Sequence, residues 1–165
     1  MAGYRHSLLR EGVVAGMIGG AAVALWFLFL DLVVQGRPLF TPNLLGQLIL
    51  QRGAGDVSAL NPGLIAAYSM LHFGMFALFG IVVTELVHLA VQHHIWRFAL
   101  MVVLMVFEVF FVGFSFMLFT GTEGVFHWWA VLLGNTLALA AMGIYLFRAH
   151  PDLGRMLATE TLGGE

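Results

Sequence analysis

Four long apolar stretches constrain the fold of this chain more than any other feature. A helix needs about 20 apolar residues to cross the hydrocarbon core of a bilayer, which is about 30 Å thick, and each stretch meets that length. The chain is 61% hydrophobic and only 10% charged, whereas a soluble domain carries about 25% charged residues. Because so few charges cannot form a water-facing surface, we predict an integral membrane protein. The predicted spans are residues 12–34, 64–90, 98–119 and 125–147.

The connections between the spans predict how the helices are arranged. Residues 92–97 and 120–124 are short enough to be tight turns, so the spans that they join are expected to be antiparallel neighbours. We therefore predict an all-α integral membrane fold, an up-down bundle of four transmembrane helices that forms a single domain. A short inner tail, residues 148–165, follows the last span.

The first connection, residues 35–63, is much longer than the others. Within it, Thr41-Pro42 predicts the start of a short helix, because proline is favoured at the first helical position. Gln47 lies off the apolar face of this helix. We expect such an amphipathic helix to lie at the membrane interface or to cap the bundle. The apolar face comprises Leu44, Leu45, Leu48 and Ile49.

The positions of the arginines predict the orientation of the chain, because basic residues favour the cytoplasmic side of a membrane. With the N-terminus inside, five arginines lie on the cytoplasmic side and two on the outer side. We therefore expect both termini in the cytoplasm and a bacterial-type inner membrane. Asp31, near the outer end of the first span, is expected to be a solvated interfacial carboxylate. The inner arginines are Arg5, Arg10, Arg97, Arg148 and Arg155, and the outer ones are Arg37 and Arg52.

Composition excludes several classes of protein. The chain has no cysteine, which excludes disulfides, zinc–thiolate sites and cysteine-ligated iron–sulfur clusters. Its net charge of −2 lacks the basic footprint that nucleic-acid binding requires. The sequence offers no glycine-rich phosphate loop and no serine nucleophile with an ordered histidine and aspartate. A non-catalytic role is therefore favoured over an enzymatic one.

Small residues recur at every fourth position in the first and last spans. Such rows allow another helix backbone to approach closely, and this packing is a main source of helix association in lipid. The partner is either another helix of the same bundle or a helix of another subunit. The rows are Gly12, Gly16 and Gly20 in the first span and Ala130, Gly134 and Ala138 in the last.

Glu108 is the most informative single residue, because it lies near the middle of the third span. A charge at the centre of a bilayer costs about 2.5–3.5 kcal/mol on insertion scales, so such a group faces protein and is usually paired or functional. Ser115 lies nearly on the same face, and Asn135 lies at similar depth on the next span. We expect Glu108 either to hydrogen-bond to these side chains, or to act as a proton-accepting site or as an anchor for an ion, a ligand or a neighbouring subunit.

The second span carries two polar stripes. Tyr68, Ser69 and His72 share one face of its outer half, whereas Glu85 and His88 lie at its inner end. Glu85-x-x-His88 has the spacing found in di-iron carboxylate bundles. Such a site needs two copies of that motif and further glutamates, and the motif occurs once. We therefore expect no metal site, and we interpret Glu85 and His88 as an interfacial pair.

Haem b is the best cofactor candidate, because two histidines on facing helices can ligate one iron from opposite sides. His72 and His127 both fall in the outer half of the predicted bundle. Their depths differ by roughly 7 Å at a rise of about 1.5 Å per residue, a mismatch that helix tilt must reduce.

These observations favour one function and leave two alternatives. The leading hypothesis is a non-catalytic accessory subunit of a larger, bioenergetic membrane complex, in contact with lipids and with other subunits or a second copy of itself. The first alternative is a small redox protein that binds haem through His72 and His127. The second is a proton or ion conductor centred on Glu108.

Overall fold

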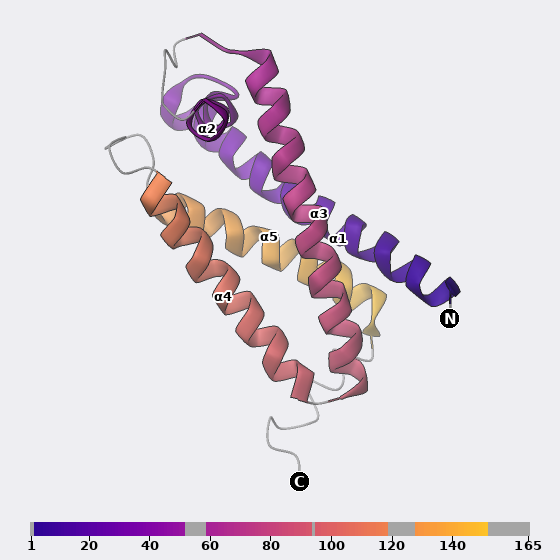
Figure 1. Ribbon diagram of the computed structural model, residues 1–165. Coiled ribbons are helices and arrows are strands. Elements are labelled where there is room, and N and C mark those ends of the chain that lie inside the picture. Colours follow the sequence, from indigo (N-terminus) through magenta and orange to yellow (C-terminus); the bar gives the residue numbers. More distant parts are fainter. Residues whose placement is uncertain (1, 52–58, 94, 119–127, 152–165) are drawn as a thin grey trace.

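The computed structural model describes residues 2–51, 59–93, 95–118 and 128–151, and all regular secondary structure among these residues is helical. Four of its helices are long and apolar enough to cross a membrane, the first of them together with the short π-helix η1 that follows it (Figure 1). The elements are α1 Ala2–Leu30, η1 Asp31–Gln35, α2 Phe40–Leu50, α3 Pro62–Gln92, α4 Ile95–Leu118 and α5 Trp128–Ala149.

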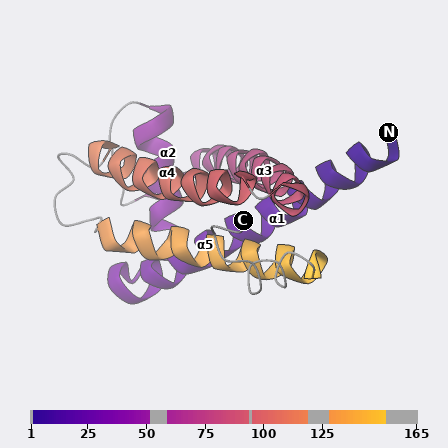
Figure 2. The same ribbon diagram turned by 90° about the horizontal axis from the view of Figure 1, so that it is seen from below.

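The four long helices form a ring in which each contacts two neighbours. α1 packs against α3 and α5, and α4 packs against the same two helices, while α3 and α5 hardly meet. Chain directions follow from side-chain contacts. Glu11 near the start of α1 lies beside His88 near the end of α3, and Trp26 near the end of α1 lies beside Ala130 at the start of α5. α1 is therefore antiparallel to both neighbours, and its first turns project beyond them (Figure 2).

The hydrophobic core lies along α1, where side chains of α3 and α5 reach toward it. In the larger of two buried clusters, Met142 and Leu146 of α5 pack with Val83 and Val87 of α3 and with Ala15 of α1. α4 contributes only partly buried leucines to it. The core is thus built by three of the four long helices, and α4 covers one side of it.

Glycines permit the close crossing of α1 and α3. A Cβ atom added at Gly16 would collide with the backbone carbonyl of Phe76, and one added at Gly12 would lie 2.5 Å from the Cα atom of Ile81. Gly80 of α3 faces the same crossing, because a Cβ atom there would collide with the backbone of Gly12 and Gly16. The row in the first span therefore packs within the chain, and Gly80 is a partner that the spacing in the first span did not reveal.

Asp31 begins η1 and is buried rather than solvated, with only 2% of its surface exposed. Its carboxylate accepts hydrogen bonds from the backbone N–H of Thr41 at 2.9 Å and from the Thr41 hydroxyl at 2.6 Å. The expectation of a solvated carboxylate was wrong, because the chain turns back after η1 and α2 covers this position. Gly36 makes that reversal in the left-handed region, at φ 62°.

α2 packs against α3 and is fixed there by two asparagines. The Asn43 side chain accepts from the backbone N–H of Asn61 at 2.9 Å and donates to the carbonyl of Ala59 at 3.2 Å. Asn61 in turn caps α3, as its position before Pro62 predicts, by accepting from the N–H groups of Gly63 and Leu64. Gln47, which we placed off the apolar face of this helix, is also buried.

Candidate functional site

An apolar cavity of about 640 Å³ lies among the helices and is the main candidate for a binding site. All five α-helices contribute to its wall, with α3 and α4 supplying most of the residues. The α4 side consists of phenylalanines, and Phe79 of α3 stacks on Phe107 with ring centroids 3.8 Å apart. This volume falls in the range of about 300–1,000 Å³ that small-molecule sites occupy. The phenylalanines of α4 in the wall are Phe107, Phe110, Phe111 and Phe114.

Three polar side chains interrupt this apolar wall, and two of them come from the predicted outer stripe of α3. Tyr68 and His72 line the cavity with ring centroids 6.0 Å apart, and Asn135 joins them from α5. His72 Nε2 lies 3.1 Å from the carbonyl oxygen of Gly20. Because a carbonyl only accepts, Nε2 carries the proton of that bond. Ser69, the third member of the stripe, is not in the wall, and its hydroxyl donates to the carbonyl of Ile65.

Glu108 and Asn135 form no hydrogen bond with each other in the described part of the chain. Both carboxyl oxygens of Glu108 and the Nδ2 atom of Asn135 are buried and have no hydrogen-bond partner among the described residues. The side chain of Ser115, the other partner considered for Glu108, lies outside the described part of the chain. An unpaired polar atom away from water is costly, so these atoms require an explanation.

The haem hypothesis depends on a residue outside the described ranges. His127 precedes the first described residue of α5, so its position relative to His72 is not shown. His72 itself faces the cavity with Nε2 engaged by Gly20, which leaves Nδ1 as the nitrogen available to a ligand.

The small residues of α5 face α1. Ala130 and Ala138 are buried, and a Cβ atom at Gly134 would lie 3.0 Å from the Trp26 ring. The Trp26 indole N–H donates to the carbonyl of Ala130 at 2.8 Å. Gly20, the last glycine of the row in α1, packs against Phe73 of α3. Both rows therefore serve contacts inside the described bundle.

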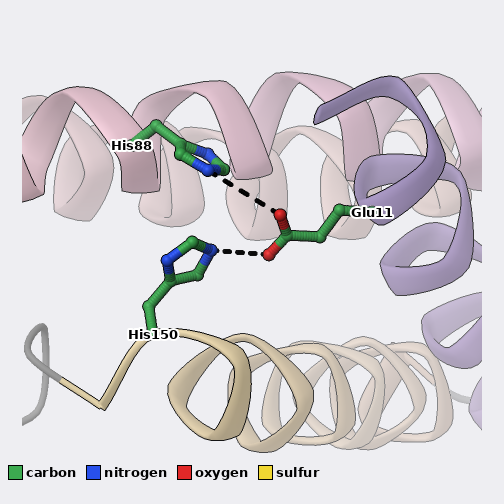
Figure 3. Close-up of side chains that lie close together, drawn as sticks. All are labelled: Glu11, His88 and His150. Atoms are coloured by element: carbon green, nitrogen blue, oxygen red, sulfur yellow. Dashed lines mark hydrogen bonds and ion pairs between the residues drawn. The ribbon is translucent and has the colours of Figure 1, made fainter. Parts of the chain in front are cut away.

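Glu85 and His88 differ in their surroundings. Glu85 is exposed, whereas His88 is half-buried and faces Glu11 of α1 and His150, the residue after α5 (Figure 3). Glu11 and His150 belong to no motif in the sequence. One feature of the sequence does point to them. Glu11 lies just before the first apolar stretch and His150 just after the last, so both are predicted at the inner side of the membrane, together with His88.

Compared with models of protein families, with curated proteins and with solved structures, the chain matches none. Functional inference therefore depends on its own residues.

Proposed function

We propose that this chain is a non-catalytic accessory subunit of a larger membrane protein complex. It crosses the bacterial cytoplasmic membrane as an up-down bundle of α1 with η1, α3, α4 and α5, with both termini inside. α2 lies at the outer interface against the bundle. A transmembrane helix of a partner subunit packs against the open side of the apolar cavity, between α3 and α4.

The observation that carries this proposal is an open apolar wall that contains an unpaired amide, together with an unpaired carboxyl group on α4. Both oxygens of Glu108 and Nδ2 of Asn135 have no partner among the described residues, and Asn135 is part of the cavity wall. Hydrocarbon offers no hydrogen bond, so the Asn135 amide gains a bond when its side chain turns into the cavity and meets a polar side chain of a partner helix.

The exposure of α4 supports the same proposal. No residue in the most apolar stretch of α4 is fully buried within the chain. In the corresponding stretch of α5, 39% of the residues are buried. Phe110 and Phe114 line the cavity and still expose 61% and 39% of their surfaces. In lipid, helix association relies on close packing and interhelical hydrogen bonds, and this face offers large rings with polar atoms nearby.

Native mass spectrometry tests the proposal on protein extracted from its own membrane in mild detergent. We expect a complex with a different chain in fixed stoichiometry. Phe110→Ala should lower the complexed fraction, because the truncation removes the ring from the docking wall. Phe98→Ala is the matched control, since Phe98 lies on the same helix, is 69% exposed and does not line the cavity.

Two outcomes would contradict an accessory-subunit role. One is that the chain is a stable monomer in every detergent tested, including the mildest. The other is a complex made only of copies of this chain, or one that Phe98→Ala and Phe110→Ala weaken equally.

A second candidate function is binding of haem b or another flat lipophilic cofactor in the same cavity. It is favoured by the position of His72 and Tyr68 in a wall that is otherwise apolar. A visible spectrum of protein expressed with excess haem tests it. A Soret band that His72→Ala abolishes would support this function, and the absence of such a band would exclude haem.

A further inference from the structure

Three side chains converge where α1 begins and where α3 and α5 end: Glu11 of α1, His88 of α3 and His150, which directly follows α5 (Figure 3). His150 Nε2 lies 2.6 Å from one oxygen of Glu11, and His88 Nε2 lies 3.7 Å from the other. All three side chains are half-buried, with 15–22% of each exposed. Their three nearest donor atoms lie within 4.8 Å of one another.

A hydrogen bond behind His88 orients its ring toward this point. Nδ1 of His88 lies 2.8 Å from the carbonyl oxygen of Thr84. Because that oxygen only accepts, Nδ1 carries the proton, and Nε2 of the neutral ring presents its lone pair toward Glu11. Histidines that bind metals almost always donate their second ring N–H to a carbonyl or carboxylate in this way.

We propose that Glu11, His88 and His150 bind a divalent first-row transition metal, with zinc as the best match, and that the metal ties α1, α3 and the end of α5 together. Two imidazoles and one carboxylate form a ligand set that zinc adopts in proteins, with the fourth tetrahedral position left to water or another small ligand. Soft thiolate ligands are absent because the chain has no cysteine.

Side-chain movements of up to about 1.5 Å separate the observed arrangement, whose ligand atoms lie within 4.8 Å of one another, from a zinc site. Zinc bonds of about 2.0–2.1 Å place tetrahedral ligand atoms about 3.3 Å apart. The Glu11 oxygens must therefore retreat slightly from His150 and approach His88. The proton that His150 Nε2 donates to Glu11 must also move to Nδ1, because a neutral imidazole binds a metal through the nitrogen that carries no proton.

Zinc titration of the full chain in detergent or nanodiscs tests the site, with an affinity tag that contains no histidine. We expect one zinc ion per chain and a thermal unfolding temperature that rises with zinc concentration, because a ligand that binds only the folded state stabilises it. Glu11→Gln and His150→Gln should each weaken zinc binding by at least about tenfold. Removing a residue that only orients a metal ligand already costs about that much, and the loss of a ligand should cost no less.

His93→Gln is the matched control, because His93 lies at the same end of α3, is exposed and is not part of the cluster. It should leave zinc affinity unchanged. His150 follows the last turn of α5, so its variant is the one to rely on if Glu11→Gln does not fold.

X-ray absorption at the zinc edge should show nitrogen and oxygen ligands at about 2.0–2.1 Å. The proposal is overturned if zinc does not bind stoichiometrically, or if the folded His150→Gln and His93→Gln variants bind it equally.

Discussion

Asp31 shows how a single buried carboxylate can determine a local chain path. It ends the regular part of the first long helix, and both of its oxygens accept hydrogen bonds from Thr41, ten residues later. Its backbone carbonyl also accepts from the N–H groups of Gly36 and Arg37. One residue therefore ends α1, opens the π-helix and holds the start of α2. A sequence pattern places such a residue at a span end but does not show what folds over it.

Replacing Asp31 by alanine should destabilise the chain. The Thr41 side chain and amide are buried and would lose their acceptor, which costs about 1–3 kcal/mol for a polar group left unpaired. Thermal unfolding in detergent, followed by tryptophan fluorescence, should show a lower midpoint. Glu85→Ala is the control, because Glu85 is an exposed carboxylate on α3. Equal midpoints for the two variants would mean that the Asp31–Thr41 hydrogen bonds contribute nothing.

At the scale of helices, the crossing of α1 and α3 depends on the absence of side chains. Gly16 and Gly80 meet there with no room for a Cβ atom on either. Polar contacts are sparse along this interface, and the core clusters on both sides of the crossing are apolar. The energy of the pair therefore comes from packing, as expected for helices in lipid.

Gly16→Ala should separate these two helices at a measurable cost in stability. The new methyl group would collide with the backbone at Phe76, which cannot move aside as a flexible side chain would. Overpacking of this kind costs about 1–3 kcal/mol. Gly74→Ala is the matched control, since a Cβ atom there meets nothing within 4 Å, and alanine is the better helix former by about 1 kcal/mol. The unfolding midpoint should fall for Gly16→Ala and not for Gly74→Ala. A lower midpoint for Gly74→Ala than for Gly16→Ala would contradict a close approach of α1 and α3 at Gly16.

The helices themselves could be predicted from the sequence far better than their contacts. Length and apolar composition alone reveal the four long helices, because a span must exceed a minimum length. Asn61 and Pro62 also revealed where α3 begins. The burial of Gln47 could not be predicted, since it depends on α2 folding back onto α3, and helical periodicity describes one helix at a time.

At the scale of the whole molecule, the candidate sites join residues that are far apart along the chain. Glu11 and His150 are separated by 139 positions, and the cavity wall draws on all five α-helices. Tyr68 and His72 were predicted together because they share one helix, and the structure keeps them together. The meeting of His88 with Glu11 and His150 was missed because it requires three helices to be placed correctly. Local patterns therefore predicted polar stripes, and only the packed bundle shows which stripes converge.

The absence of cysteine makes the proposed orientation directly measurable, because each introduced cysteine is the only thiol in the chain. Leu60, exposed between α2 and α3, should lie outside, and His93, exposed between α3 and α4, should lie inside. In intact spheroplasts, a membrane-impermeant maleimide should label Leu60→Cys at once, and His93→Cys only after permeabilisation. Leu25→Cys, on the exposed face of α1 within a span, should resist the reagent in both conditions because hydrocarbon surrounds it. Early labelling of His93→Cys with protection of Leu60→Cys would invert the orientation, and rapid labelling of Leu25→Cys would mean that water reaches the first span.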